Sequence, residues 1–264
     1  MTSELVLVLD KGYVRLCDVL GSDLSIVNAA RASYGKESKK WSAADERLMA
    51  YLAKHGHDSP FRHAVMTFEI KAPLMVARQW FKYRVGSAHT TDTLSTDISA
   101  RLMYDQWEGA GDDGADGRSA DAMQARNETS RRYVSSMPEW YMPEYWRIAQ
   151  EGNKQASSSP ATVCQSAELS HGLRIVQDVA MHWYEKALTA GIGGEMARLF
   201  LPAYGMYTSW RWTASLSAVA WFVQQRTPPG AQQEIRDYAS AVASLTSDAY
   251  PRAWAHLMEA RRQS

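Results

Sequence analysis

Residues 78–104 read RQWFKYRVGSAHTTDTLSTDISARLMY and join an apolar helix to a polar loop. The stretch opens with the end of a helix that carries Trp80 and Phe81, and then runs through mostly small polar residues to Ser99-Ala100-Arg101. Basic side chains therefore flank a loop rich in hydroxyl groups. Backbone N–H groups, hydroxyls and guanidinium groups together are what a bound phosphate or phosphate ester requires. The alternative interpretation is a solvated surface loop that follows a core helix.

The residues in this stretch resemble the signature of the flavin-dependent thymidylate synthases. In that family the usual form is Arg-His-Arg, a short spacer, and then Asn-Glu-x-Ser-x-Arg. Here Lys82-Tyr83-Arg84 stands in the first position and residues 96–101 (TDISAR) stand in the second. An insertion at residues 88–95 separates the two halves.

Other segments resemble the same family in the same order along the chain. They are residues 23–31, 55–63, 195–202, 207–213, 221–226 and 231–239. The chain is therefore identified as a member of the flavin-dependent thymidylate synthase family by resemblance.

Length and composition predict one domain over residues 1–264, because 45% of the 264 residues are hydrophobic. A Gly- and Asp-rich excursion without apolar periodicity is expected at 105–119. The chain has 29 basic residues (Lys and Arg) and 29 acidic residues (Asp and Glu). No net electrostatic field therefore favours binding to nucleic acid or to an anionic membrane. Two cysteines, Cys17 and Cys164, give neither a metal spacing nor a disulfide framework. We expect an untargeted protein of the reducing cytoplasm.

Local patterns predict an α+β fold with a central mixed or antiparallel sheet flanked by long helices. Strands are expected at 5–9, 13–20 and 64–70. Helices are expected from a cap at Ser22 or Asp23 to Arg31, and from a Ser42 cap with Asp45 in third position to Lys54. A long helix is expected from about Pro160, capped by Ser159, to Ala190, with Gly191 ending it. Residues 137–148, rich in Trp and Tyr and interrupted by prolines, are expected to pack as short helices.

The turn at residues 55–63, HGHDSPFRH, allows two interpretations. Its three histidines are the right residue type for a metal, but they share no helix face and no nearby Asp or Cys completes a known spacing, so we predict no metal site. The resemblance instead implies that His57 and Ser59 lie beside the flavin.

The resemblance also implies the remaining site residues. Gln79, Ser99, Arg101 and Arg198, with Ala100 between the second and third of these, would gather the nucleotide phosphate. Arg226 corresponds to the arginine that faces the uracil, and it is expected to be catalytic, while Lys82 and Asp97 would touch both sugar and flavin. Arg198 and Arg226 are both expected in apolar helical surroundings. The other flavin-binding positions implied are Tyr83, Arg84, Val85, Thr96, Ser215, Ser217 and Trp221.

Three departures from the family pattern reduce the expected flavin contacts. Ser215-Leu216-Ser217 stands where the family has Asn-x-Arg, Trp221 replaces Asn or His, and Lys82-Tyr83-Arg84 replaces Arg-His-Arg. The flavin would then be held by stacking on Tyr83 and Trp221, or by the inserted His89, Thr90 and Thr91. These changes resemble the branch of uridylate C5-methylases found in nucleoside-antibiotic pathways such as polyoxin formation.

The function implied is reductive C5-methylation of UMP, dUMP or both, in a homotetramer with shared active sites. Methylenetetrahydrofolate would donate the carbon, FAD the hydride, and NADPH would reduce the flavin. Two alternatives stay open: a hydroxymethylase on the same scaffold, and a nucleotide-binding protein without catalysis. Thymidylate synthase chemistry through a cysteine nucleophile is disfavoured, because Cys164 lies in Thr-Val-Cys-Gln and not in a Pro-Cys-His sequence.

Overall fold

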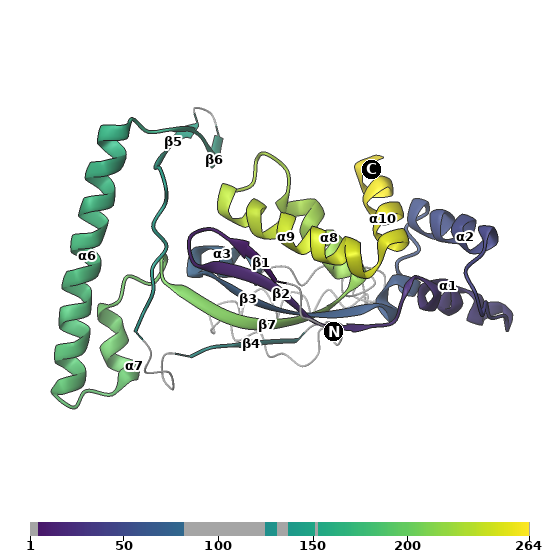
Figure 1. Cartoon of the computed structure of the whole chain (residues 1–264), viewed down its shortest axis with the longest axis horizontal. Helices are drawn as coiled ribbons and strands as arrows, with labels where there is room; N and C mark the ends of the chain where they lie inside the picture. The colour runs from purple at the N-terminus through teal and green to yellow at the C-terminus, as the bar shows by residue number, and fades with distance from the viewer. Residues whose placement is uncertain (1–4, 82–124, 131–136, 151–152, 264) are drawn as a thin grey trace, which may run out of the picture.

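The computed structural model describes residues 5–81, 125–130, 137–150 and 153–263. A five-stranded sheet in the order β1-β2-β3-β7-β4 forms its centre (Figure 1). All four neighbouring strand pairs are antiparallel. The strands are β1 (Leu5–Val8), β2 (Gly12–Leu20), β3 (Val65–Pro73), β7 (Tyr207–Ser215) and β4 (Ala125–Glu128). The predicted α+β class is confirmed, and the sheet is antiparallel.

The first two strands form the predicted hairpin. Leu5 pairs with Arg15 and Val8 with Gly12. Gly12 is required at the turn, because a Cβ atom there would collide with the Tyr238 hydroxyl and lie 2.7 Å from the Lys71 carbonyl oxygen. The hairpin is therefore fitted closely to β3 and to the helix that carries Tyr238.

Alternation along β3 places one face of the sheet in the core. Met66, Phe68, Ile70 and Ala72 are fully buried, while the residues between them are partly exposed. Phe68 stands opposite Trp212 of β7, and their ring centroids lie 5.8 Å apart. The predicted strand at 64–70 is confirmed and extends to Pro73.

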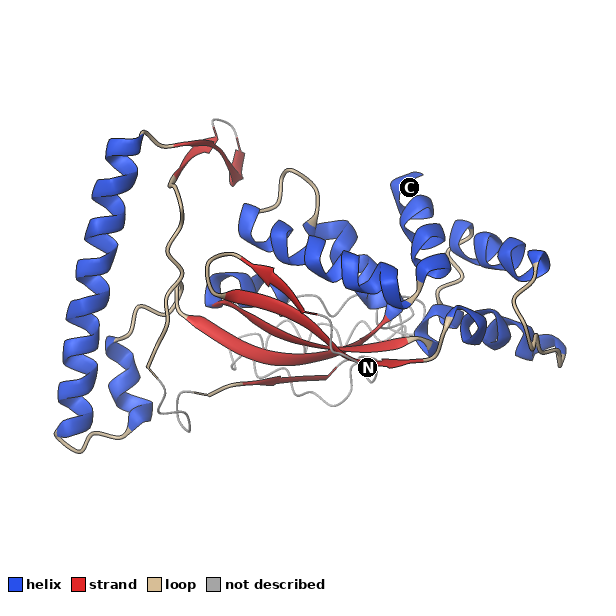
Figure 2. Ribbon diagram, viewed as in Figure 1, coloured by secondary structure: helices blue, strands red, loops and turns tan. Residues whose placement is uncertain are grey.

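Helices α8 (Leu216–Arg226) and α9 (Gln233–Ala249) lie over one face of the sheet (Figure 2). Helix α3 (Leu74–Trp80) follows β3 directly. Its last residue, Trp80, contacts both the sheet and α8. The Trp80 ring stacks on Phe222 of α8 at 4.3 Å between centroids, and meets Trp210 of β7 edge-on at 5.4 Å. Aromatic contacts thus connect the sheet to α3 and α8.

The N-terminal helices form where their caps predict. Helix α1 (Asp23–Arg31) begins after Ser22, and α2 (Ala43–Lys54) begins after Ser42 with a capping box from Asp45. The fully buried Asp45 carboxylate accepts hydrogen bonds from Ser42 N at 2.9 Å and from Arg31 Nη2 at 2.7 Å. Both predicted helices and the predicted position of Asp45 are confirmed.

A second lobe projects from the sheet (Figure 1). It contains α6 (Val163–Thr189), α7 (Gly194–Ala197), the 3-10 turn Arg198–Phe200, and a hairpin of β5 (Arg147–Gln150) with β6 (Asn153–Pro160). The long helix is confirmed: it ends at Thr189, and Gly191, two residues later, has a φ of 81°. The predicted cap was wrong: Thr162 caps α6, because Ser159 is paired with Ile148 in the hairpin.

The prediction of short helices at 137–148 was also wrong. Among the described residues this segment is extended and ends in β5. Pro138 and Pro143 each lack a backbone N–H and disfavour helical geometry in the preceding residue. The aromatic residues instead anchor the segment: Trp140 Nε1 donates to the Pro202 carbonyl at 2.9 Å, and Trp146 Nε1 donates to Ser170 Oγ at 3.0 Å.

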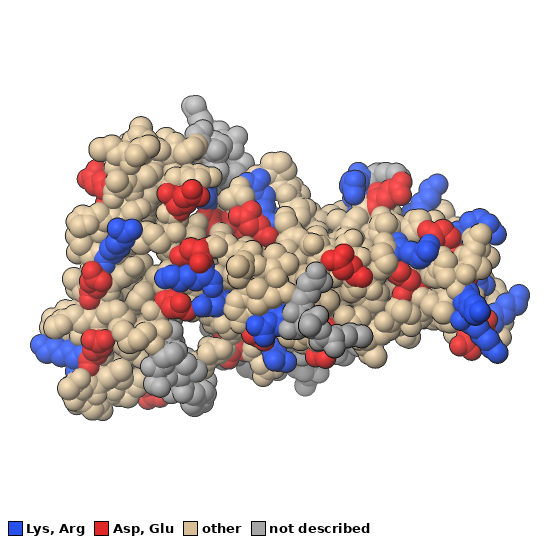
Figure 3. All heavy atoms as spheres, in the orientation of Figure 1, with Lys and Arg blue, Asp and Glu red and all other residues tan. Residues whose placement is uncertain are grey.

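Two sequence expectations fall outside the described residues. They are the insertion at 88–95 and the Gly- and Asp-rich excursion at 105–119. Within the described part, no helix is long and apolar enough to cross a membrane. Acidic and basic side chains are interspersed over the face shown in Figure 3.

The buried Asp45 carboxylate generates a stability prediction. Burial alone raises its pKa, but hydrogen bonds from Ser42, Ser38 and Arg31 outweigh this and lower the pKa to about 2 from 3.8. We expect Asp45→Asn to lower the free energy of unfolding at pH 7 by about 2 kcal/mol. The carboxylate stabilises the fold above the unfolded-state pKa, so the difference should disappear as the pH falls from about 4 towards 2. Urea denaturation across this range measures it.

The matched control is Asp248→Asn, since Asp248 is an exposed aspartate on α9. Its free energy of unfolding should stay within about 0.5 kcal/mol of the parent. Equal stability of Asp45→Asn and the parent at pH 7 would contradict the assigned role of Asp45.

Candidate active site

Helix α8 carries four of the residues that the sequence implicates. Ser215 is its N-cap, and Ser215 Oγ accepts a hydrogen bond from Ala218 N at 3.3 Å. Ser215 and Ser217 are both fully buried, whereas Trp221 and Arg226 are partly exposed. Ser217 Oγ has no hydrogen-bond partner in the described part of the chain. A buried hydroxyl without a partner is unusual and indicates that a further group can satisfy it at this face of α8.

The turn that carries His57 and Ser59 is held against the start of α8. It follows α2, turns at Gly56 with a φ of 66°, and continues into the 3-10 helix Ser59–His63. Leu216 N donates to the Ala64 carbonyl at 2.8 Å, which ties the end of this segment to α8. His57 and Ser59 are both exposed. The structure thus brings both residues to the helix that carries Ser217 and Trp221.

Gln79 is bonded to the end of the connection between α8 and α9, and Arg226 lies at the start of that connection. Arg226 is the last residue of α8, and Gln232 is the N-cap residue of α9. Gln79 Nε2, on the last turn of α3, donates to Gln232 Oε1 at 2.6 Å. Gln79, which is predicted to bind phosphate, is therefore bonded to the α8–α9 connection. That connection begins at Arg226, which is predicted to face uracil.

A buried ion pair supports this connection. Gln232 Nε2 also donates to Glu234 Oε2 at 2.8 Å, and Glu234 is only 3% exposed. Arg147 Nη2 donates to both Glu234 oxygens, at 2.6 and 2.8 Å, and the Tyr141 hydroxyl donates to Oε1 at 3.2 Å. Burial raises the pKa of Glu234, but the Arg147 guanidinium and other hydrogen bonds outweigh it, so the net shift is downward. The carboxylate is ionised and fixes the amide of Gln232.

Sequence reasoning did not find this support. Residues 231–239 were recognised as a family segment, but nothing in the local pattern pairs Glu234 with Arg147, which lies 87 positions earlier. A polar residue predicted on a buried helix face is the signal that indicates such a partner.

Arg198 lies elsewhere. It begins the 3-10 turn after α7, beside α6 and on the side of the molecule away from α8 (Figure 1). Its side chain is exposed, with Nε donating to the Glu195 carbonyl at 3.2 Å. The expected apolar helical surroundings were wrong for Arg198, because α7 is a single short turn and the following Leu199 is itself exposed. One chain does not bring Arg198 to Gln79 and Arg226.

The rest of the predicted site lies outside the described residues. These positions are Lys82, Tyr83, Arg84, Val85, Thr96, Asp97, Ser99, Ala100 and Arg101. The structure fixes where this segment begins, because Trp80 is buried and Phe81 meets the Trp210 ring edge-on at 5.2 Å. As for metals, no group of three or more His, Cys, Asp or Glu side chains in the described ranges could hold an ion.

The accessible residues in the flavin half suit a flavin. Trp221 offers an aromatic face, and His57 and Ser59 offer exposed hydrogen-bonding groups. The Ser217 hydroxyl adds a polar atom one helical turn from Trp221 that has no partner among the described residues. Ser217 is itself fully buried, so the mixed aromatic and polar surface that an isoalloxazine ring requires is offered by Trp221, His57 and Ser59.

Comparison with known proteins identifies the class. The family described as "Thymidylate synthase complementing protein" matches residues 15–108 and 120–252. The chain belongs to this family. The interruption at residues 109–119 falls within the Gly- and Asp-rich segment predicted to be an excursion.

Curated relatives make the type of enzyme specific. The chain is 38% identical over 256 residues to "Flavin-dependent thymidylate synthase" from Thermus thermophilus, covering 96% of this chain and 79% of the relative. It is 35% identical over 244 residues to the protein of the same name from Thermotoga neapolitana, covering 92% of this chain and 89% of the relative. It is an enzyme of the flavin-dependent thymidylate synthase type.

A solved structure shares the fold. The UMP/dUMP methylase PolB from Streptomyces cacaoi, bound with 5-Br UMP, superposes with a TM-score of 0.73 at 22% identity, covering 97% of this chain and 98% of that one. The same protein bound with 5-Br dUMP also gives a TM-score of 0.73, at 21% identity. At this identity the likeness establishes the fold alone.

The buried ion pair beneath Gln232 generates the second prediction. Glu234→Gln removes the carboxylate from a guanidinium whose side chain is only 16% exposed. We expect a loss of about 3 kcal/mol in the free energy of unfolding, measured by chemical denaturation. Arg147→Met combined with Glu234→Gln should lose less than the sum of the two single changes, because neither charge is then stranded. Additive losses would contradict the pairing.

Proposed function

We propose that the chain catalyses reductive methylation of C5 of a uridine monophosphate, UMP or dUMP, with methylenetetrahydrofolate as carbon donor. The observation that carries the proposal is the hydrogen bond from Gln79 to the connection that starts at Arg226. This bond supports the proposal because it ties an amide suited to a phosphate or sugar to the connection that begins at a guanidinium suited to an anionic ring. The relatives named flavin-dependent thymidylate synthase and the methylase PolB support the same substrate class.

Arg226 is the catalytic residue in this proposal. When C5 of uracil attacks an electrophile, negative charge builds on N3 and O4 of the ring. A fixed guanidinium lowers that barrier without reorganising at the moment of reaction. Arg226 is suited to this role because its Nε atom is buried, and charge interactions are stronger where water is excluded.

The remaining residues would bind and orient the reactants. Gln79, fixed by Gln232, would orient the nucleotide. The segment that lies outside the described residues is proposed to complete the phosphate and sugar contacts. Its contributing residues are Lys82, Asp97, Ser99, Ala100 and Arg101. His57, Ser59 and Trp221 would hold FAD, together with Tyr83, Arg84, Val85, Thr96, Ser215 and Ser217. When bound, FAD supplies the hydride that completes the methyl group, with NADPH as its reductant.

Neither cysteine is suited to act as the nucleophile. Cys17 lies on β2, and burial is the largest of the effects that raise the pKa of its thiol, so it is not an activated thiolate. Cys164 lies exposed at the start of α6, in the lobe that projects from the sheet. Carbon transfer through an arginine-polarised uracil requires no thiol.

We also propose that the chain assembles as a homotetramer and that its sites combine several subunits. Helix α6 exposes several large apolar side chains along its length. Monomeric proteins rarely leave an extended apolar patch exposed to water. The exposed side chains of α6 are Val163, Leu169, Ile175, Val176, Val179, Trp183 and Leu188, each between 40% and 88% exposed. Arg198, which would contribute to phosphate binding, lies next to this helix and on the side of the molecule away from α8, the helix that ends at Arg226. Association through α6 would bury the apolar surface and let Arg198 serve a neighbouring subunit.

The product mass tests the reaction. After incubation with UMP or dUMP, methylenetetrahydrofolate, FAD and NADPH, the nucleotide should gain a methyl group. A gain of hydroxymethyl would favour the hydroxymethylase, and no product despite nucleotide binding would favour the binding protein without catalysis. We expect both nucleotides to react, because pocket shape alone discriminates a hydroxyl by about a hundredfold at most. A preference for dUMP above about a thousandfold would exclude dual specificity.

Substitutions test the catalytic assignment. Arg226→Ala should lower kcat by about a hundredfold or more, roughly 3 kcal/mol of transition-state stabilisation. The matched control is the double change Cys17→Ala and Cys164→Ala, which should leave turnover within about threefold. Loss of activity in a folded Cys164→Ala variant would contradict a thiol-independent reaction.

The assembly has its own test. Val176→Glu with Val179→Glu places two charges on the apolar stripe of α6, and we expect the tetramer to dissociate into smaller species by light scattering. Arg174→Glu, an exposed polar position on the same helix, is the control and should leave the mass unchanged. A monomeric parent protein would rule out the assembly.

A further inference from the structure

The C-terminal helix α10 (Pro251–Gln263) places one arginine against two separate segments of the candidate site. Arg261 Nη1 donates to Gln224 Oε1 of α8 at 3.2 Å, and Gln224 Nε2 donates back to the Arg261 carbonyl at 3.1 Å. Arg261 Nη2 lies 3.6 Å from Asp58 Oδ1, and its Cζ lies 5.7 Å from the centre of the Trp221 ring. The Arg261 side chain is only 15% exposed. One guanidinium therefore joins α10, α8 and the turn that contains Asp58.

The segments joined in this way are the two expected to face the flavin. Asp58 stands between His57 and Ser59, and Trp221 is the aromatic residue of α8. In this chain, α8 lacks the Asn-x-Arg expected from the family and has Ser215 and Ser217 there, both buried. Among the described residues, the cation that contacts the Trp221 ring is Arg261, which α10 supplies.

Arg261 lies beyond the segment that defines the family. The family match ends at residue 252, whereas Asp58, Trp221 and Gln224 all lie inside it. The contact therefore couples a position outside the family segment to three positions within it.

The chemistry of Arg261 suits a clamp. Burial lowers its pKa and Asp58 opposes this shift. A largely buried guanidinium is tolerated only where hydrogen bonds, an opposite charge or an aromatic face compensate. Arginine can engage Gln224, Asp58 and Trp221 at once because its planar group carries several donors, which a lysine ammonium cannot match.

We propose that Arg261 is a positioning residue for the flavin: it holds the His57–Ser59 turn against Trp221, so that the two walls of the flavin half keep a fixed separation. This inference rests on the proposed function, because the ligand that the walls receive is FAD. Arg261 acts through Asp58 and Trp221 and not by contact with the reacting atoms.

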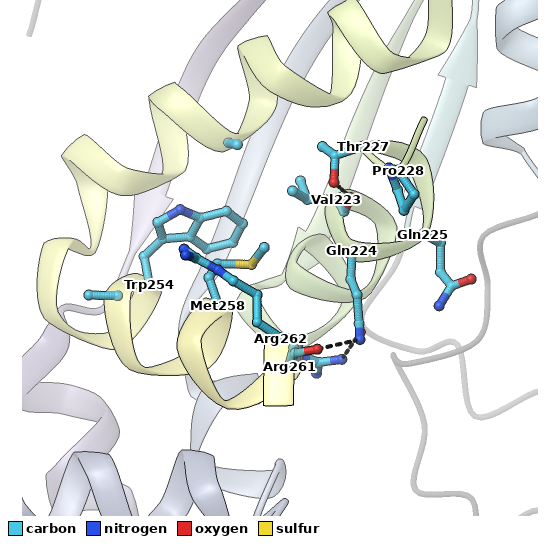
Figure 4. A pocket seen from close by; sticks show the side chains of 11 residues that line it. Val223, Gln224, Gln225, Thr227, Pro228, Trp254, Met258, Arg261 and Arg262 are labelled. Carbon is cyan, nitrogen blue, oxygen red and sulfur yellow. Dashed lines mark hydrogen bonds between the residues drawn. The ribbon is translucent and has the colours of Figure 1, made fainter. Parts of the chain in front are cut away.

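A neighbouring arginine provides the matched control. A pocket of about 720 Å³ opens between α8, α9 and α10, and both Arg261 and Arg262 line it (Figure 4). Arg262 is exposed, and Figure 4 draws no hydrogen bond from it to the other residues shown, whereas Arg261 is joined to Gln224. Changing Arg262 removes the same charge from the same helix without disturbing the clamp.

The experiment measures FAD affinity by flavin fluorescence in the full-length parent and in Arg261→Met, Arg261→Lys and Arg262→Met. Methionine keeps an apolar stem of similar reach, which favours a folded variant. We expect Arg261→Met to raise the Kd for FAD about tenfold, Arg261→Lys to fall between it and the parent, and Arg262→Met to stay within about twofold. The Kd for UMP, measured without flavin, should stay within about twofold in all variants.

A second measurement separates positioning from general stability. Amide hydrogen exchange at residues 56–59 should be faster in Arg261→Met, while exchange in the β3 and β7 core stays as in the parent. A Kd for FAD within about twofold of the parent overturns the inference, even if the Tm falls. An equal loss in Arg262→Met also overturns it, since charge alone would then account for the effect. A parent that binds no FAD at saturation refutes the flavin-dependent function itself, and with it this inference.

Discussion

The stacking of Trp80 on Phe222 is the contact on which the rest of the site depends. Trp80 is the last residue of α3, so its burial fixes where the chain leaves the core and enters the segment with Lys82. Phe222 lies on the buried side of α8, so the same contact fixes the rotation of that helix and hence the direction of Trp221. Trp210 closes the cluster from the sheet. One aromatic cluster therefore sets both halves of the site, and a change of volume there would be felt at each.

Polar groups refine what the aromatic cluster positions roughly. Apolar contacts are non-directional, so they cannot orient an amide such as that of Gln79. Hydrogen bonds can, and here Gln232 is held by Glu234, which is itself held by two bonds from Arg147. The burial of this ion pair is costly unless its geometry is well satisfied. The pair holds Gln232, which in turn holds Gln79, so it supports a side chain of the candidate nucleotide site.

The sequence predicted the fold best where a few neighbouring residues carry the information. The Ser42 and Asp45 capping box and the alternation of β3 were read correctly, because cap and pleat are local. Residues 137–148 and the Ser159 cap were misread, since their conformations depend on distant partners, the Pro202 carbonyl and Ile148. For the site, the family resemblance predicted individual residues and their roles. It did not reveal Glu234, Arg147 or Arg261, whose partners are fixed only in three dimensions.

The proposed division of the site between chains would account for the position of Arg198. An exposed guanidinium contributes little to binding a phosphate, because water competes for its donors and salt screens its charge. The same charge becomes effective once a neighbouring surface excludes water from it. Leu199 and Phe200, the next two residues, are exposed apolar side chains beside α6, so a partner that covers them would also desolvate Arg198. Apolar association and phosphate recognition would then be one event, and dilution below the assembly threshold would weaken nucleotide binding without any change in the fold of each chain.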